Sequence, residues 1–419
     1  MHSEHVPFFQ NNELNLKMQK SCSQRSRFSF RRKLRSTLFL TWATCSVFSH
    51  CYTSLTSRCA RADWPFVRGN TSGTGVAEGS LPDTPASLWE FKTEKSDEGF
   101  EATPIIANGL VIVGDFKGSF YAIELATGKL VWKNKLKQGV VVPAACNGNR
   151  IIIADFDSNL YCFDLSGKEV WARETEQPMV NGAIILGADV IYASDYGSLV
   201  CLDLETGKEK WIYETGDQLK SSPSVWKNLS FLGGCDSQLH KVDISNGQSL
   251  GTPIPLMSPT LCTPNVIGDI VITPTQPGNV YAIRVDTGEK VWSYTPDPAL
   301  GLDVRSSPAT SATVDGNTLK GTVVLPSRNR RILALDASNG KVKWESLLRK
   351  RSDSSPVICG DRVWIGSSDG KVYGLDLATG KEVWSYQLSG QILASPAISN
   401  DKLVIATEKG SIVCFGSRP

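Results

Sequence analysis

The sequence predicts an all-β fold, an eight-bladed β-propeller made of four-stranded antiparallel blades. Three observations predict it: a tryptophan that recurs about every forty residues, a glycine turn just before it, and a matching series of prolines. A fixed repeat of about 40–50 residues is typical of propellers and solenoids. Short runs rich in Val, Ile, Tyr and Trp alternate with turn residues, which favours pleated strands over helices.

The tryptophans mark the fourth, outermost strand of each blade. We expect each indole to face the next blade, where its burial removes ~150–250 Å² from water and contributes ~4–6 kcal/mol as an upper bound. The series consists of Trp89, Trp132, Trp171, Trp211, Trp292, Trp344 and Trp384, with Gly251 at the remaining position.

The turn before the tryptophan reads Asp-x-x-Thr-Gly-Lys in its clearest copies. Its glycine is expected to take a positive φ, which a β-carbon disfavours. These glycines are Gly128, Gly207, Gly288 and Gly380. In the copy that ends at Trp384, the four strands are expected at Pro356–Cys359, Arg362–Gly366, Lys371–Leu377 and Glu382–Gln387.

Prolines mark the start of the innermost strand, because proline cannot donate to a strand ladder and suits the first residue of a strand. Only the third blade lacks one, around Gly182. The series consists of Pro104, Pro143, Pro223, Pro264, Pro308, Pro356 and Pro396.

The two ends of the repeat region are expected to share one blade. The last copy, Ser395–Phe415, supplies three strands, and Ser87–Lys92 supplies the fourth, which removes free sheet edges. Seven blades is the alternative, if the weak copy at Leu239–Gly251 belongs to a neighbouring blade. The predicted divisions are a leader at 1–62, an extended lead-in at 63–86 and a single propeller at 87–419.

The glycine-lysine turn that leads to a tryptophan, repeated eight times, resembles the pyrrolo-quinoline-quinone-type (PQQ-like) propeller repeat family. The resemblance covers about residues 87–415, and Asp63–Gly69 looks like the segment that precedes such propellers in bacterial secreted proteins. The short single-domain form is similar to the branch of outer-membrane β-barrel assembly factor B (BamB), a non-enzymatic scaffold. Longer members are quinoprotein alcohol dehydrogenases, and fold alone does not choose between the two classes.

The first 62 residues predict export. They hold ten of the 44 basic and two of the 42 acidic residues, so 34 bases face 40 acids in the remainder, which argues against a nucleic-acid partner. Arg31–Arg35, the apolar run Leu38–Phe48 and a cleavage site at Ala60–Ala62 have the order of a signal peptide. The run is short for a membrane span. A start at Met18 or later is the alternative, the twin-arginine match is poor, and Cys51 lacks a proper lipobox.

The search for catalytic or metal-binding residues favours structural roles. His240 is the only histidine beyond the leader, which argues against zinc, and Asp155–Asn159 is better explained by an Asx-type turn than by a calcium loop. Cys162, Cys201 and Cys414 share one strand position and are expected to be small buried residues. No cofactor is expected; PQQ with calcium enters only with the dehydrogenase alternative.

Candidate partner-binding residues lie on two loops between blades. The loop after Trp292 is the longest, and Leu302, Asp303 and Arg305 should project from it near the mouth of the channel. Asp217, Leu219 and Lys220 occupy the similar place two blades earlier. The resemblance implies docking through leucine and arginine on such loops; an ordinary solvated loop is the alternative.

The function that these observations favour is an exported, non-enzymatic scaffold for protein–protein interaction, with a role in outer-membrane or envelope protein assembly. The expected partners are envelope proteins, with at most peripheral membrane association and a monomeric propeller in the periplasm or at the envelope. A PQQ-dependent alcohol or sugar dehydrogenase and a ligand-sensing module linked to signalling are the alternatives.

Overall fold

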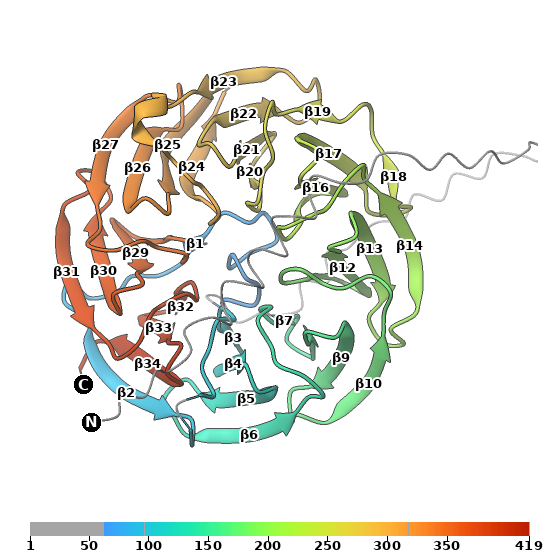
Figure 1. Ribbon diagram of the computed structural model, residues 1–419, viewed down its shortest axis with the longest axis vertical. Coiled ribbons are helices and arrows are strands. Elements are labelled where there is room, and N and C mark those ends of the chain that lie inside the picture. The colour runs from blue at the N-terminus through green and yellow to red at the C-terminus, as the bar shows by residue number, and fades with distance from the viewer. Residues whose placement is uncertain (1–62, 96, 317, 419) are drawn as a thin grey trace, which may run out of the picture. The chain divides into compact units, whose positions relative to one another are not determined.

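The computed structural model describes residues 63–95, 97–316 and 318–418, and the predicted leader lies outside the described residues. In this part of the chain, eight sheets surround a central axis (Figure 1). The prediction of an all-β, eight-bladed propeller is confirmed. The seven-bladed alternative is wrong, because residues 224–255 form a sheet of their own.

Seven blades run from the axis outward in chain order, and the eighth takes its outermost strand from the N-terminal side of the chain. The first four blades comprise β3 (Ile105–Ala107), β4 (Leu110–Gly114), β5 (Ser119–Glu124) and β6 (Leu130–Lys135); β7 (Ala145–Cys146), β8 (Arg150–Ala154), β9 (Asn159–Asp164) and β10 (Glu169–Glu174); β11 (Ile184–Leu186), β12 (Asp189–Ala193), β13 (Ser198–Asp203) and β14 (Glu209–Glu214); and β15 (Ser224–Trp226), β16 (Leu229–Gly233), β17 (Gln238–Asp243), β18 (Gln248–Ser249) and β19 (Ile254–Pro255).

The other four blades follow the same plan, and a 3₁₀ turn, η2 (Pro298–Leu300), lies in the long loop between the fifth and sixth. They comprise β20 (Asn265–Ile267), β21 (Ile270–Pro274), β22 (Val280–Arg284) and β23 (Lys290–Tyr294); β24 (Ala309–Asp315), β25 (Thr318–Pro326), β26 (Arg331–Asp336) and β27 (Val342–Leu347); β28 (Val357–Cys359), β29 (Arg362–Gly366), β30 (Lys371–Asp376) and β31 (Glu382–Gln387); and β32 (Ala397–Ser399), β33 (Lys402–Ala406), β34 (Ser411–Gly416) and β2 (Ala86–Lys92).

The N-terminal strand closes the ring as predicted. Strand β2 pairs antiparallel with β34, and Trp89 lies opposite Cys414. The last blade therefore joins both ends of the repeat region, and its outer edge is occupied by the chain itself.

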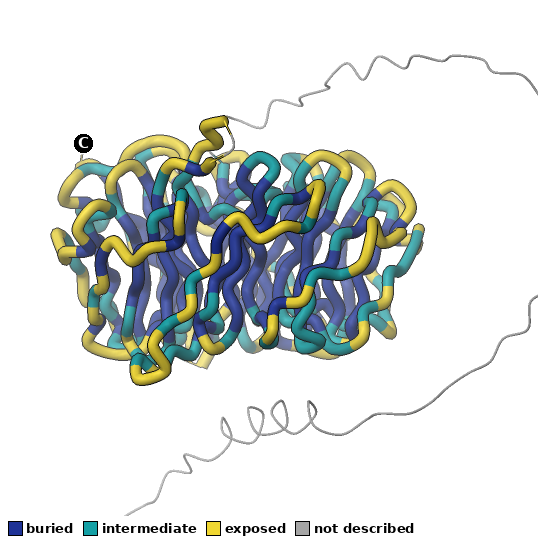
Figure 2. The backbone as a smooth tube through the Cα atoms, turned by 90° about the horizontal axis from the view of Figure 1, so that it is seen from above, coloured by how far each residue is buried: buried dark blue, intermediate teal, exposed yellow. Residues whose placement is uncertain are grey.

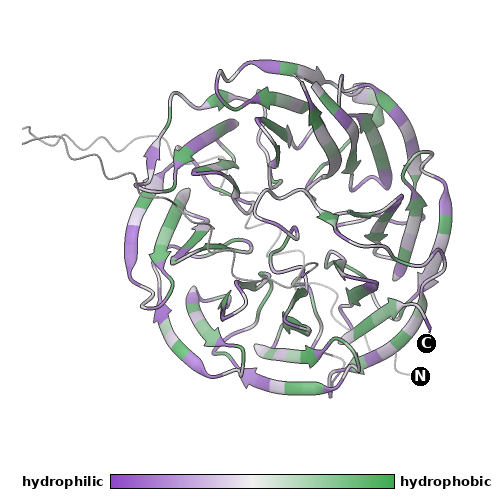
Figure 3. Ribbon diagram, turned by 180° about the vertical axis from the view of Figure 1, so that it is seen from behind, coloured by the Kyte–Doolittle hydropathy of each residue, from purple (hydrophilic) through white to green (hydrophobic). Residues whose placement is uncertain are grey.

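The core lies in the inner strands. Residues of the first three strands of a blade are largely buried, whereas the outer strand alternates between exposed and partly buried residues, as β6 shows. In the side view of Figure 2, buried strands lie between two layers of exposed loops. Apolar residues are correspondingly concentrated in the inner strands (Figure 3).

The tryptophans attach each blade to the next. Six indole N–H groups donate to a backbone carbonyl of the following blade at 2.8–3.1 Å, and the indole also covers a turn glycine there. A Cβ on Gly128 would lie 2.7 Å from the ring of Trp89, so this glycine is required for packing as well as for its φ of +73°. The six pairs are Trp89–Leu125, Trp132–Leu165, Trp171–Leu204, Trp211–Ile244, Trp292–Ala337 and Trp344–Leu377.

The fourth blade departs from this pattern and from the prediction of four strands. Its outer strand is split into β18 and β19 around Gly251, which has no side chain to pack. Lys241 Nζ donates instead to Val285 O of the next blade at 2.9 Å. Ile254 takes the place of the indole against Gly288, whose φ is +73°.

The lead-in crosses the axis and contacts the innermost strands. Its backbone carbonyls from Trp64 to Gly75 accept hydrogen bonds from six blades, and β1 (Val76–Ala77) adds to β28 as a parallel strand. Figure 1 shows this segment inside the ring. The donors are Ile106, Cys146, Val225, Val266, Thr310 and Ile358.

Candidate functional site: an arginine-rich surface on the loops between blades

The loops between blades and the turns between second and third strands form one face, here called the upper face. At eight equivalent places, a backbone N–H of the turn donates to a carbonyl of the loop that enters the same blade. This bonding fixes the loops relative to the sheets. The donor–acceptor pairs are Phe116–Gly99, Phe156–Gly139, Asp195–Pro178, Cys235–Gln218, Gln276–Pro259, Arg328–Asp303, Ser368–Arg351 and Glu408–Gln391.

The residue after each acceptor carbonyl points into the core. In the described residues all eight are buried, so a loop residue's place relative to that carbonyl decides whether it reaches solvent. The eight are Phe100, Val140, Met179, Leu219, Thr260, Val304, Ser352 and Ile392.

Leu219 is therefore corrected from a docking residue to a core residue, because its side chain is fully buried. The counterpart of Leu219 in the long loop is Val304, not Leu302. A sequence signal exists, since Phe100, Leu219, Val304 and Ile392 each stand four residues before a blade proline.

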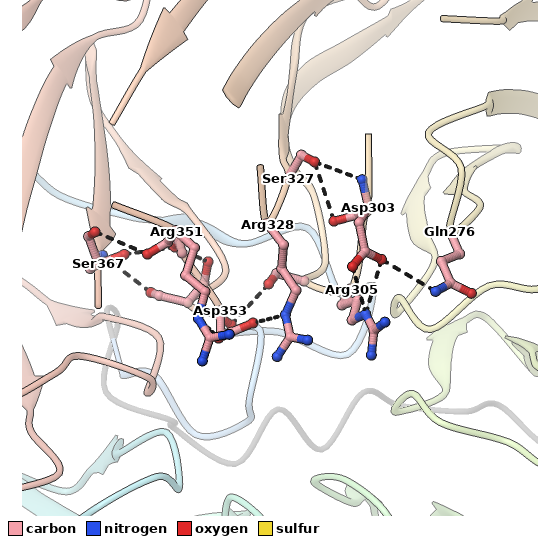
Figure 4. Close-up of polar contacts among 12 residues, drawn as sticks. Gln276, Asp303, Arg305, Ser327, Arg328, Arg351, Asp353 and Ser367 are labelled. Atoms are coloured by element: carbon pink, nitrogen blue, oxygen red, sulfur yellow. Dashed lines mark hydrogen bonds and ion pairs between the residues drawn. The ribbon is translucent and has the colours of Figure 1, made fainter. Parts of the chain in front are cut away.

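Asp303 is the centre of a polar network in the long loop (Figure 4). Its carboxylate accepts from Arg305 Nε at 3.0 and 3.1 Å and from Gln276 Nε2 at 3.3 Å. Its backbone N–H donates to Ser327 Oγ at 2.9 Å. Leu302 packs over Gly278, where a Cβ would lie 2.7 Å from its Cδ1. The loop thus presents a leucine and an arginine in fixed positions.

A second network continues from the first onto the next blade (Figure 4). Asp353 pairs with Arg328 Nε and, at 3.5 Å, with Arg351 Nε, and its carbonyl accepts from Ser306 Oγ at 2.9 Å. Ser367 Oγ donates to Arg351 O at 3.1 Å. Such partly exposed pairs contribute little to stability, so their main effect is to orient the arginines.

The sixth blade and its two flanking loops carry an excess of cations. Arg305, Arg328 and Arg351 pair with Asp303 or Asp353. Arg330, Arg349 and Lys350 are exposed, and their side chains form no ion pair with the described residues. We call these six cations, together with Leu302, the blade 5–7 surface. Sequence reasoning found Leu302, Asp303 and Arg305 but missed the other cations, which lie on separate loops.

The second loop predicted to bind a partner, which carries Asp217, Leu219 and Lys220, lies two blades before the long loop. Lys220 pairs with Asp195 of the adjacent turn, and Asp217 Oδ1 accepts from the N–H of Gln218 at 2.8 Å. Both are partly exposed. Lys220 is the structural counterpart of Arg305, but its surroundings lack the cation excess of the blade 5–7 surface.

Residues Asp155–Asn159 form an Asx turn, as the sequence predicts. Asp155 Oδ1 accepts from the backbone N–H of Asp157 and of Asn159, and its Oδ2 accepts from the hydroxyl of Tyr161 at 3.0 Å. Its oxygens are occupied by protein donors. The buried His240 lies between Tyr213 and Asp236, at 2.9 and 2.6 Å.

The three equivalent cysteines are fully buried thiols. Burial raises the pKa of Cys162, Cys201 and Cys414 to about 12. A thiol that holds its proton this firmly is a poor nucleophile. These residues act as small core side chains.

The dehydrogenase alternative would need a quinone–calcium site. Such a site needs an aromatic platform and carboxylate ligands. Six of the blade tryptophans are bonded between blades, and the lead-in occupies the axis. Among the described residues, no group of three His, Cys, Asp or Glu side chains could hold a metal ion.

Comparison with known proteins places the chain in a family. A family model described as outer membrane protein assembly factor BamB matches residues 81–294 and 299–419. The chain belongs to the BamB family. The curated BamB of Shewanella oneidensis is 26% identical over 167 residues, 37% of this chain and 40% of the relative. BamB of Escherichia coli is 30% identical over 67 residues, 16% of this chain and 17% of the relative. The match thus spans about two fifths of the first relative's length.

Solved structures share the fold. BamB from Moraxella catarrhalis superposes with a TM-score of 0.67 at 17% identity, covering 80% of this chain and 98% of that one. Quinohemoprotein alcohol dehydrogenase from Comamonas testosteroni gives a TM-score of 0.69 at 14% identity, covering 87% and 82%. At such identities the likeness concerns the fold alone.

Proposed function

We propose that this protein is an exported scaffold in outer-membrane protein assembly, which docks an envelope protein on the blade 5–7 surface. The observation that carries the proposal is the loop of Leu302 and Arg305, held rigidly by Asp303 on a member of the BamB family. A preorganised loop loses little conformational entropy on binding.

The chemistry of this surface suits an acidic partner segment with an apolar anchor. Leu302 offers apolar contact, and Arg330, Arg349 and Lys350 offer charges that pair with none of the described residues. Complementary charge speeds encounter and makes binding sensitive to salt. We therefore expect the complex to weaken as ionic strength rises.

The proposed location is the periplasm or envelope after export. It rests on the signal-like leader and on family membership. Among the described residues, no helix is long and apolar enough to cross a membrane. Contact with the membrane is proposed to be peripheral at most.

The test is affinity capture of envelope proteins by the purified chain. The variant Leu302→Ala combined with Arg305→Gln should lose at least tenfold of the captured partner, because the leucine contact and the oriented guanidinium are both removed. Arg305→Gln avoids placing a second negative charge beside Asp303. Captured proteins are identified by mass spectrometry.

Arg150→Gln is the matched control. Arg150 makes an ion pair of 2.8 Å with Glu205, and its side chain is 27% exposed, against 29% for Arg305. It begins β8, at the opposite end of the sheet from the upper face. Undiminished capture by the Leu302/Arg305 variant, or an equal loss in the control, contradicts the proposed surface.

A further inference from the structure

A buried guanidinium that forms no ion pair within the described part of the chain lies at the axis. Arg68 of the lead-in is 1% exposed, and its Nη2 donates to Pro308 O and to Pro356 O, both at 2.8 Å. Its Nε and Nη1 have no hydrogen-bond partner among the described residues. Three N–H hydrogens of one cation are thus left unused in the interior.

None of the described residues neutralises this cation with an opposite charge. Burial lowers the pKa of Arg68 to about 9, which leaves the side chain protonated near neutral pH. Arg68 forms no ion pair with the described residues. A buried charge of this kind is costly unless an opposite charge compensates it.

Hydroxyl side chains precede the blade prolines, two of which Arg68 contacts. The residue before the blade proline is serine or threonine in six blades, and four of these residues accept a hydrogen bond from the backbone of a neighbouring blade at 2.9–3.0 Å. We call these four the hydroxyl collar: Ser307, Ser355, Ser395 and Thr103.

The collar hydroxyls have hydrogens to donate. In the described residues each serves only as an acceptor from a backbone N–H, so each O–H remains available. The carbonyls that Arg68 binds belong to Pro308 and Pro356, the residues directly after two collar members. The hydroxyl of Thr263, the residue after Cys262, is also buried and has no hydrogen-bond partner in the part of the chain that the structure describes. Unused hydroxyl donors thus directly precede the two prolines whose carbonyls Arg68 binds.

We propose that this axial position binds a small oxyanion, with Arg68 Nε and Nη1 as the charged donors and Thr263 and the hydroxyl collar as neutral donors. Oxyanions accept several charge-assisted hydrogen bonds at once, and arginine suits their geometry. The collar members are 6–9% exposed. Glu101 stands two residues before the collar member Thr103, and burial together with Asp353 and Glu408 raises its pKa.

The site is separate from the blade 5–7 surface, and its occupancy does not depend on the proposed function. Binding would tie the lead-in to the innermost strands through Arg68 and so stabilise the closed ring. Inorganic phosphate and acetate are the probes, because they distinguish a free phosphate from a carboxylate as the source of the oxyanion.

Thermal unfolding and calorimetry of the purified chain test the proposal, with chloride at matched ionic strength as the reference. We expect a saturable rise in Tm with at least one probe, of a few degrees at a hundredfold excess over Kd. The rise should disappear in Arg68→Met. In Thr263→Val the Kd should increase several-fold while the Tm in chloride stays unchanged, since this substitution removes no hydrogen bond within the protein.

Arg351→Gln is the control, because Arg351 is an exposed arginine of the upper face. It should bind the probes as the parent does. Absence of saturable binding by both probes overturns the proposal, as does binding that Thr263→Val and Arg68→Met leave unchanged. If Arg68→Met does not fold, Thr263→Val decides alone.

Discussion

Two glycines of the first blade provide a matched test of the packing between blades. Gly109 and Gly128 have φ of +74° and +73°, so alanine meets the same left-handed backbone at both. A Cβ on Gly109 contacts nothing within 4 Å, whereas one on Gly128 would lie 2.7 Å from the Trp89 ring. The two substitutions therefore differ only in the contact with the closing strand.

The expected losses in the free energy of unfolding follow from the left-handed backbone and from the contact with the indole. Left-handed backbone costs an alanine ~1–2 kcal/mol at either position. Overpacking adds about 1–3 kcal/mol at Gly128 alone. The free energy of unfolding should fall by ~1–2 kcal/mol in Gly109→Ala and by ~2–5 kcal/mol in Gly128→Ala. Urea denaturation measures both, and the midpoints compare directly when the m-values agree.

The same two substitutions in a Trp89→Leu variant test whether the indole causes the difference in stability. With the indole removed, the two alanine substitutions should cost the same within about 0.5 kcal/mol. Equal losses in the parent protein, or a difference that persists in the Trp89→Leu background, would show that the indole–glycine contact does not hold the closing strand.

Two further predictions concern the fourth blade and the core thiols. Lys241→Met should lower the free energy of unfolding by about 1–2 kcal/mol, because the bond to Val285 O replaces the indole bond of other blades; an unchanged urea midpoint would contradict this. The raised pKa values of Cys162, Cys201 and Cys414 predict alkaline sensitivity. Their stabilisation is complete below pH ~9 and is lost between pH ~9 and ~12, where thiols ionise in the unfolded chain but not in the folded one. Each thiol should contribute a slope of about 1 kcal/mol per pH unit. Cys201→Ala should reduce the fall of unfolding free energy with pH by the contribution of one thiol. An unaltered dependence of stability on pH would argue against burial of this thiol.

The repeat made the ring predictable. Each blade carries its own local signals, namely the proline before the innermost strand, the turn glycine and the outer tryptophan, so eight blades and the closing strand Ser87–Lys92 followed from counting. The second role of Gly128, beneath the indole of Trp89, did not follow, because positive φ alone explains a glycine in that turn.

The axis and the blade 5–7 surface were less accessible to prediction. The lead-in bonds to the inner strands through backbone groups, which have no sequence signature. Leu219 was misplaced because a leucine in a loop can face either side, and only alignment on the blade prolines separates its position from that of Leu302. Arg330 belongs to the turn before β26, whereas Arg349 and Lys350 belong to the loop after β27, and only the folded blade brings these two segments together.

Photocrosslinking in intact cells tests the scaffold account most directly. A photoreactive phenylalanine analogue at Leu302 should yield a crosslink to an outer-membrane assembly protein, whereas the same analogue at Val131, 54% exposed on an outer strand, should yield none. Crosslinks of equal yield from both positions, or none from Leu302 in cells where the protein is abundant, would contradict docking at the blade 5–7 surface.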